Sequence, residues 1–459
     1  MKLILVTAIV SLILACGYWK FHELTRPLPL PKLDTSKYWG PGDAAKHKPD
    51  ARIKPFVIKR STEEITDLIS LLNRPHKLTE PLEGINFEYG MNSRALEKIV
   101  QFWRDDYLSK WSERETFLNK FPQYTTEIQG LNIHYIHAKP SAEDAKNKRV
   151  IPLLLLHGWP GSVREFYDFI PMLTTANNLN DFVFEVIAPS LVGYGWSDAA
   201  AKRGFNAAQM AIVMRNLMLR VGHQKFLVQG GDWGSIIGSI VATLFPENVL
   251  GYHSNMCTLQ TPLALMKFYV ASFYPEKFVP SPICIEHHFP LKEKLIYLLK
   301  ESGYFHIQAT KPDTIGTALS HSPIGLAAYI LEKFQTATGP HSSYRHNAMD
   351  ESFTLEAVLD NVMIYYLSNT ATSAVRFYAE NMSPEMFALQ MERVQSPVPM
   401  GCVRFKNDLP AAMDWQLRDK FPNLVHSKYF GDGGHFAALE VPDKLFIDFA
   451  EFVEQIKFD

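Results

Sequence analysis

The sequence is short of cysteine and carries almost no net charge. Its four cysteines are too few and too scattered for a disulfide framework or a zinc cluster, and their use is typical of a reducing compartment; they are Cys16, Cys257, Cys284 and Cys402. With 46 basic and 48 acidic residues the formal charge is −2, so no global positive field exists to attract a phosphate backbone. The sequence also lacks a dinucleotide-binding fingerprint and a zinc-ligand spacing. We therefore expect no nucleic-acid partner, no metal and no organic cofactor.

The composition is that of a large folded protein. Hydrophobic residues make up 47% of the 459 residues and charged residues 20%, a balance that buries a substantial core and argues against extended disorder. Aromatic residues at 12% are typical of apolar, ring-rich pockets.

The one long apolar run lies at the N-terminus. Between Leu3 and Cys16 only Thr7 and Ser11 are polar, and the run ends in an aromatic pair, Tyr18 and Trp19. Basic residues follow it, which places the body of the protein in the cytosol. We predict an uncleaved single-pass anchor over residues 1–24, in an endoplasmic reticulum membrane.

Two other readings of this segment stay open. Ala15 before Cys16 could form the processing site of a secretory signal, and Cys16 could be a lipoprotein signal. The aromatic pair and the absence of paired cysteines downstream favour the anchor.

The rest of the chain alternates between patterns. Residues 25–123 predict an irregular strap and helices that cover a core, and Ser61 and Glu64 predict a capping box at the start of one helix. Residues 124–137 predict a hairpin that turns at Gly130-Leu131. Residues 124–254 alternate buried apolar runs with helical patterns, as in an open α/β sheet with parallel strands. This alternation is lost over 255–395, which predicts a helical lid, and returns over 396–459.

A sharp turn between a strand and a helix carries the chemistry. Asp232 stands between Gly230-Gly231 and Gly234, after an apolar strand and before a helical run. Small residues on both sides of the apex allow such a turn, which lifts the apical side chain above the sheet. A carboxylate there can attack a saturated carbon and form an ester that water can open. The alternative is that Asp232 only caps the next helix.

Two backbone donors are expected beside this carboxylate. In this architecture the residue after the nucleophile and a residue of the first strand–helix turn form the oxyanion hole. The candidates are Trp233 and Trp159, the latter in the turn that follows Ile151 to Leu156. His157 of the same turn is interpreted as structural.

A base and its acid partner are expected downstream. His435 follows a short strand near the C-terminus, and Asp408 follows the preceding strand. A neutral imidazole could deprotonate water if a carboxylate fixes its tautomer. Asp414 and Asp432 are the rivals of Asp408.

Together these motifs resemble the microsomal epoxide hydrolase family, within the α/β-hydrolase fold. The resemblance covers nearly the whole chain, and its motifs are Trp39-Gly40-Pro41-Gly42, His157 to Ser162, Gly193 to Ser197, the Asp232 turn, Glu301 to Tyr304, Arg376 to Asn381 and Gly433 to Phe436. It implies that Tyr304 and Tyr378 of the lid donate hydrogen bonds to an epoxide oxygen. The family often has Glu where this chain has Asp408, and the segment from Asn255 to Cys257 most resembles the juvenile-hormone branch.

The resemblance implies hydrolysis of lipophilic epoxides, by water, to vicinal diols. Two alternatives are a haloalkane dehalogenase, which uses the same kind of Asp turn, and a membrane-anchored, non-catalytic protein that binds lipophilic ligands. The two tyrosines argue against the first, and the presence of nucleophile, base and acid argues against the second.

Overall fold

A nine-stranded β-sheet forms the centre of the computed structural model, which describes residues 2–458 except 75–76, 179, 280–284, 287, 338, 340–341, 343–344, 346–347 and 410. The strand order is β1-β2-β3-β5-β4-β6-β7-β8-β9. The bounds are β1 Lys54–Phe56, β2 Gln123–Ile128, β3 Leu131–Ala138, β4 Arg149–Leu156, β5 Phe182–Pro189, β6 Phe226–Gly230, β7 Val249–Ser254, β8 Met400–Phe405 and β9 Leu424–Phe430.

The sheet is antiparallel at one edge and parallel from β5 to β9. In the centre, β4 pairs in parallel with both neighbours, so that Leu154 faces Ile187 and Leu156 faces Gly230. These continuous apolar runs are buried on both faces, as parallel strands require. The carboxyl ends of β4, β6, β8 and β9 therefore meet at one edge of the sheet, where ligands bind in such folds.

The antiparallel edge is a hairpin that the sequence predicts. Strands β2 and β3 are joined by Gln129 and Gly130, whose φ angles are +54° and +83°. Two consecutive positive φ angles match the right-handed twist of the strands, and glycine adopts such an angle without strain.

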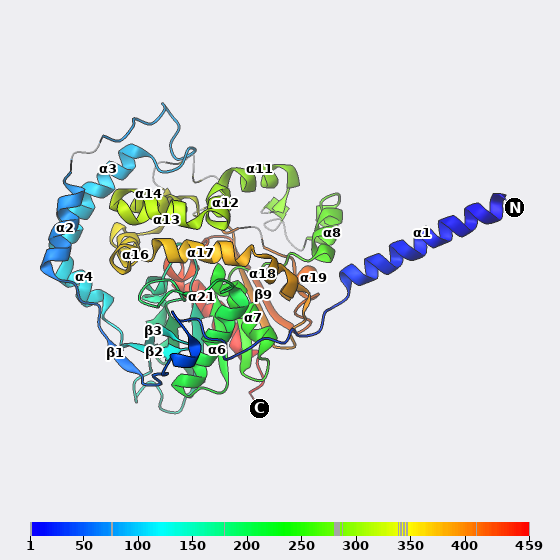
Figure 1. Cartoon of the computed structure of the whole chain (residues 1–459), viewed down its shortest axis with the longest axis horizontal. Coiled ribbons are helices and arrows are strands. Elements are labelled where there is room, and N and C mark those ends of the chain that lie inside the picture. The colour runs from blue at the N-terminus through cyan, green and yellow to red at the C-terminus, as the bar shows by residue number, and fades with distance from the viewer. Residues whose placement is uncertain are drawn as a thin grey trace.

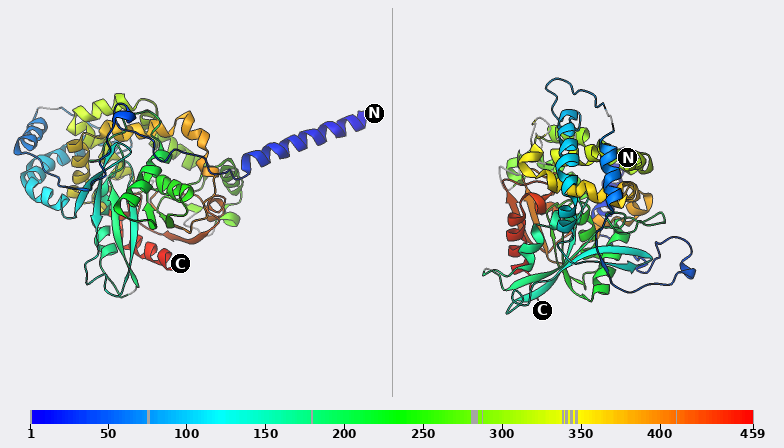
Figure 2. Two further views of the ribbon diagram at one scale, coloured as in Figure 1. Left: turned by 60° about the horizontal axis from the view of Figure 1, so that its bottom comes forward. Right: turned by 90° about the vertical axis from the view of Figure 1, so that its left-hand side faces the viewer.

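Helices cover both faces of the sheet (Figures 1 and 2). On one side α21 packs on α5 and on β7 to β9, and on the other α6 packs on α7. These core helices are α5 Phe169–Thr174, α6 Ala207–Val221, α7 Trp233–Leu244, α19 Asp414–Leu417, α20 Ala437–Glu440 and α21 Pro442–Glu454. The result is the predicted α/β architecture.

The region before the core consists of a long N-terminal helix, a strap and then shorter helices. Its helices are α1 Lys2–Thr25, α2 Thr62–Leu72, α3 Ser93–Phe102 and α4 Trp111–Leu118. Ser61 and Glu64 form the predicted capping box at the start of α2. In the strap, Trp39 is fully buried, with its ring centroid 5.1 Å from that of Phe205.

Between β7 and β8 every regular element that the structure describes is helical. These elements form the lid, which lies over the carboxyl edge of the sheet (Figure 1). Its α-helices are α8 Pro262–Ala271, α9 Pro275–Phe278, α11 Leu291–Glu301, α12 Gly303–Thr310, α13 Pro312–His321, α14 Pro323–Thr336, α15 Ala348–Ser352, α16 Leu355–Ser368, α17 Ala371–Asn381 and α18 Pro384–Leu389.

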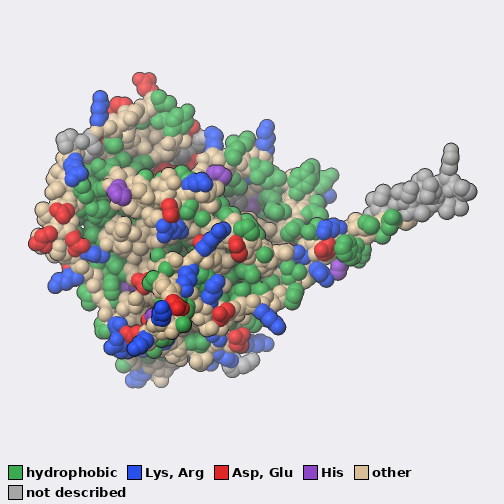
Figure 3. Space-filling view, viewed as in Figure 1, with side chains coloured by type: hydrophobic (Ala, Val, Ile, Leu, Met, Phe, Trp, Pro, Cys, Tyr) green, Lys and Arg blue, Asp and Glu red, His purple; other side chains and the backbone are tan. Residues whose placement is uncertain are grey.

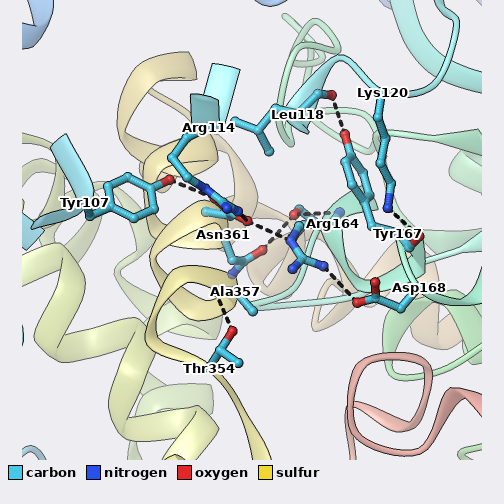
Figure 4. A network of polar contacts seen from close by, with 12 residues as sticks. Tyr107, Arg114, Leu118, Lys120, Arg164, Tyr167, Asp168, Thr354, Ala357 and Asn361 are labelled. Carbon is cyan, nitrogen blue, oxygen red and sulfur yellow. Dashed lines mark hydrogen bonds and ion pairs between the residues drawn. The ribbon is translucent and has the colours of Figure 1, made fainter. Parts of the chain in front are cut away.

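A buried carboxylate joins the lid to the N-terminal helices and to the core (Figure 4). Asp360 of α16 is fully buried. It accepts hydrogen bonds from the Tyr107 hydroxyl at 2.8 Å and from the guanidinium groups of Arg114 and Arg164, whose Nε atoms lie at 3.0 and 2.8 Å. Because two cations and a phenol satisfy its oxygens, the buried charge ties three separate segments together.

The N-terminal segment is helical, and two of the cysteines are bonded to each other. The predicted anchor forms α1, and among the described residues no helix has both the length and the apolar character needed to cross a membrane. The expectation that the cysteines stay unpaired is wrong for Cys257 and Cys402, whose sulfurs form a disulfide across 145 residues. Cys16 is free and exposed, and Cys284 lies outside the described residues.

Candidate active site

Asp232 occupies the apex of the turn between β6 and α7. Its φ and ψ angles are +48° and −129°, a strained conformation for a residue with a side chain. A Cβ atom at position 158 would lie 2.1 Å from Asp232 Oδ1, and one at position 234 would lie 2.0 Å from the Leu156 carbonyl oxygen. Glycine at 158 and 234 is therefore what allows the turn and its carboxylate to approach β4 so closely.

One of the two expected backbone donors contacts the carboxylate directly. The Trp159 N–H donates to Asp232 Oδ1 at 2.7 Å. Trp233, the other candidate, is the first residue of α7 and follows Asp232 directly. Donors held this way can stabilise the negative charge that develops on the carbonyl oxygen during ester hydrolysis.

His435 lies between two carboxylates. Its Nδ1 is 2.7 Å from Asp408 Oδ1, and its Nε2 is 3.4 Å from Asp232 Oδ2. The rival acids are engaged elsewhere, since Asp414 pairs with Arg404 and Asp432 with Lys444. The structure thus brings together Asp232, Asp408 and His435, the three core residues that the sequence singles out.

The two carboxylates control the protonation of His435. Burial lowers the pKa of the imidazole, but the charges and hydrogen bonds of Asp408 and Asp232 outweigh burial and raise the pKa well above its usual value. His157, by contrast, is neutral: it accepts the Leu191 N–H at Nε2, and burial lowers its pKa to about 4. His157 is a structural residue of the turn.

Two tyrosines reach the site from the lid. Tyr304 of α12 stacks on the Trp159 ring at 5.1 Å, and Tyr378 of α17 lies edge-on to Trp233 at 4.9 Å. Their own ring centroids are 6.2 Å apart. Burial, and then the charge of Asp232 among other neighbours, raises the pKa of both hydroxyls, so both stay protonated and can donate hydrogen bonds.

A small cavity of about 70 Å³ lies between the lid and the core. Lid residues and the loops after β4, β8 and β9 line it, namely Trp159, Pro160, Tyr297, Glu301, Tyr304, Lys333, Thr336, Ala337, Asn407, Asp408, Leu409, His435 and Phe436. Its walls are mostly apolar and aromatic, and three of the predicted site residues, Tyr304, Asp408 and His435, line it.

The sequence did not single out three titratable residues near this cavity, Glu165, Glu440 and Lys333. Burial raises the pKa of Glu165 and of Glu440 to about 8, and both interact with His435. Glu440 accepts the Phe436 N–H at 2.9 Å, which fixes the loop that carries His435. The Lys333 ammonium lies 4.4 Å from the centre of the Tyr304 ring. The apolar residues around 165 and 440 are the only sequence signal for their burial.

Among the residues that the structure describes, two side-chain groups could hold a metal ion, and neither includes a residue of this site. They are His137, Glu185 and His223, and His426, Asp448 and Glu451. In each group the acids already pair with histidine or lysine inside the chain.

Two family models of known proteins match parts of this chain. Residues 53–166 match the family model described as "Epoxide hydrolase N terminus", and residues 151–278 match that of the alpha/beta hydrolase fold. The fold and the matches define an α/β-hydrolase with the N-terminal extension of epoxide hydrolases.

The relatives are more specific. The chain is 48% identical to juvenile hormone epoxide hydrolase 1 of Ctenocephalides felis, over 95% of this chain and 93% of the relative, and 40% identical to epoxide hydrolase 1 of Sus scrofa, over 91% and 92%. The crystal structure of the juvenile hormone epoxide hydrolase of Bombyx mori superimposes with a TM-score of 0.89 at 42% identity, covering 92% of this chain and 99% of that one. The chain belongs to the microsomal epoxide hydrolase family, and it is an epoxide hydrolase.

Proposed function

We propose that this enzyme opens lipophilic epoxides through a covalent ester on Asp232, with Asp408, His435, Tyr304 and Tyr378 as its other catalytic residues. The observation that carries the proposal is the position of His435, whose two ring nitrogens face Asp408 and Asp232 at 2.7 and 3.4 Å. An imidazole placed there can act on water beside an ester of Asp232.

In the first step Asp232 attacks one carbon of the epoxide. A bond forms between its carboxylate oxygen and that carbon, and the bond from the carbon to the ring oxygen breaks. The departing alkoxide is basic, so it takes a proton from the phenol of Tyr304 or Tyr378. The product is a neutral hydroxyalkyl ester and a tyrosinate.

The ester changes the protonation of His435. While Asp232 is charged, it helps to raise the pKa of the imidazole. Alkylation removes that charge, so the pKa falls and His435 can become the neutral base that the second step needs. Asp408 keeps its contact with Nδ1 and holds the ring in place.

In the second step water attacks the carbonyl carbon of the ester. His435 takes a proton from the water, and the Trp159 and Trp233 N–H groups stabilise the oxyanion. The bond between the carbonyl carbon and the alkyl oxygen then breaks, and His435 returns its proton to the diol. The new Asp232 acid loses its proton, which restores the tyrosine.

We propose juvenile-hormone-like or xenobiotic lipophilic epoxides as substrates. The aromatic walls of the cavity support an apolar epoxide. The relatives from Ctenocephalides felis and Bombyx mori are named juvenile hormone epoxide hydrolases, whereas the Sus scrofa relative is named epoxide hydrolase 1. Comparing kcat/KM for a juvenile-hormone-type epoxide and for styrene oxide discriminates between these classes.

The N-terminal segment is proposed to hold the protein at the endoplasmic reticulum membrane with the catalytic body in the cytosol. The apolar run from Leu3 to Cys16 and the basic residues after it support this arrangement. Helix α1 projects away from the body, as an anchor would (Figure 1). The cysteines do not support it, because Cys257 and Cys402 are bonded.

Replacing the base tests the two-step scheme. A His435→Gln variant should still attack the epoxide but open the ester at least about 10²-fold more slowly, since its side chain cannot take a proton from water. Intact-mass measurement after mixing with epoxide should then show protein heavier by one substrate. The exposed His321→Gln variant is the control and should not accumulate adduct. Loss of turnover without adduct in His435→Gln would overturn the proposal.

A further inference from the structure

Large apolar side chains are exposed together on three helices of the lid. Figure 3 shows hydrophobic side chains gathered over α8, beside the base of α1. We call this surface the lid patch; its members lie on α8, α9 and α11 and the turn after α8, and they are Leu265, Met266, Tyr269, Val270, Phe273, Tyr274, Phe278, Leu295, Ile296, Leu298 and Leu299. Contiguous exposed apolar surface of this kind marks a site of interaction.

The lid patch is not needed to hold the lid together. A separate small core already lies beside these helices, and it buries Ala271 at the end of α8, Val279 and Phe289 in the segments next to α9 and α11, and Met413 before α19. The outward residues are far from buried: Leu299 is 80% exposed. A soluble lid would carry polar residues at these outward positions.

Helix α1 lies directly beside the lid patch. It contacts α8, and its described aromatic residues Tyr18 and Trp19 are 72% and 66% exposed. Both apolar surfaces therefore lie on the same side of the molecule (Figure 1). A flat apolar surface such as a lipid bilayer could cover both at once.

The edge of the lid patch has the chemistry of a membrane interface. Tyr269 and Tyr274 combine an apolar ring with a polar tip, which suits the headgroup level of a bilayer. Lys277, Lys292 and Lys300 are exposed around the patch and can approach anionic headgroups.

A groove in the lid patch runs along the outer side of the wall of the active site. The groove, of about 350 Å³, is lined on one side by Leu291, Leu295 and Leu298 of α11. The same helix presents Tyr297 and Glu301 to the catalytic cavity. One helix thus separates a surface groove suited to an acyl or terpenoid chain from the reacting groups.

We propose that the lid patch docks on the surface of a lipid bilayer, so that the groove along α11 opens into the acyl region next to the catalytic cavity. A lipophilic epoxide dissolved in the membrane then enters the enzyme without crossing water. The docking itself stands apart from the covalent mechanism, whereas the delivery of substrate rests on the proposed function.

The docking is tested in the full-length protein with a polarity-sensitive fluorescent amino acid. It replaces Leu299 or Phe273 in the lid patch or, as the control, Tyr89, which is 82% exposed before α3. Vesicles are made of phosphatidylcholine and phosphatidylserine with brominated acyl chains. On vesicle-bound protein the lid probes should shift to the blue and be quenched severalfold, and the probe at 89 should not change. If the lid probes on vesicle-bound protein are as exposed to water as the control probe, the proposal is overturned. It is also overturned if the blue shift appears without lipid when the protein concentration is raised.

Delivery of substrate is tested with a Phe273→Glu/Leu299→Glu variant, whose two side chains line neither cavity. Its kcat/KM for styrene oxide in solution should equal that of the parent, which shows that fold and chemistry are intact. Its KM for a lipophilic epoxide presented in vesicles should rise severalfold, while the matched Leu82→Glu/Tyr89→Glu variant keeps the parental KM. An unchanged KM contradicts delivery through the patch. Failure of the covalent mechanism would instead appear as loss of styrene oxide turnover or of the Asp232 adduct.

Discussion

The core and the lid supply different parts of the active site in different ways. The core places Asp232, Asp408 and His435 on turns that directly follow strands, so the sheet itself fixes their mutual distances. The lid brings Tyr304 and Tyr378 on two helices whose positions depend on helix packing. In the proposed mechanism the nucleophile and the base therefore lie on the rigid part, and the proton donors to the epoxide oxygen lie on the part that sequence variation can most easily reshape.

The largest loss of activity is expected when Asp232, the proposed nucleophile of the core, is replaced. Asp232→Asn should lower epoxide hydrolysis by about 10⁴-fold or more, because a neutral amide cannot form the ester. Initial rates on freshly prepared protein measure this before slow deamidation restores Asp. Asp432→Asn, an exposed acid paired with Lys444, is the control and should keep the parental rate. Parental activity of Asp232→Asn from the first turnover would contradict the proposal that the core supplies the nucleophile.

Replacing one lid tyrosine should slow ester formation less than replacing both. Tyr304→Phe or Tyr378→Phe should slow ester formation by about 10-fold to 10²-fold, since the second phenol can still donate to the alkoxide, and the double variant by more. Single-turnover quenching of tryptophan fluorescence measures this step, as Trp159 and Trp233 contact the two rings.

Tyr329 provides the matched control for the lid. Its ring lies 5.8 Å from that of Trp159, and its hydroxyl accepts a hydrogen bond from Gln308. Tyr329→Phe should leave the rate of ester formation nearly unchanged. If both single lid variants and the double variant react like the parent, the lid has no part in the chemistry.

The sequence predicts the core better than the lid, for a physical reason. Local features depend on residues that are close together in the chain, so the sequence predicts them. They are the Asp232 turn, the β2–β3 hairpin and the capping box of α2. Tyr304 and Tyr378 are two of nineteen tyrosines, and only the resemblance to a family singles them out.

The features that the sequence did not predict are long-range. Strand β1 has three residues and exists through its pairing with β2, about 70 residues later. The disulfide joins positions 145 residues apart. The burial of Glu165 and Glu440 depends on how loops of the core pack under the lid, and the apolar residues beside them in the chain do not by themselves predict it.

The smallest expected effect concerns Glu440, whose carboxyl interacts with His435. Burial raises the pKa of its carboxyl from 4.5 to about 8. Between these values the native state binds a proton that the unfolded chain has lost, so this group makes stability fall as pH rises from about 4.5 to about 8. Glu440→Gln removes the titration but keeps an oxygen that can accept the Phe436 N–H.

The Tm of Glu440→Gln should therefore decline less than that of the parent between pH 5 and pH 8, by a few degrees. The exposed Glu454→Gln variant should follow the parental slope. Identical slopes in all three proteins would mean that Glu440 is ionised in the native state, and hence that the region under His435 is more hydrated than its packing implies.

In the proposed mechanism Asp232 forms a bond to the substrate and is released by water. This bond is tested by one turnover with excess enzyme in water enriched in oxygen-18, followed by mass spectrometry of the peptide that contains Asp232 and of the diol. The heavy oxygen should appear in the Asp232 carboxyl group, and the diol should be unlabelled. Heavy oxygen in the diol of that first turnover, with none in the peptide, would contradict this mechanism.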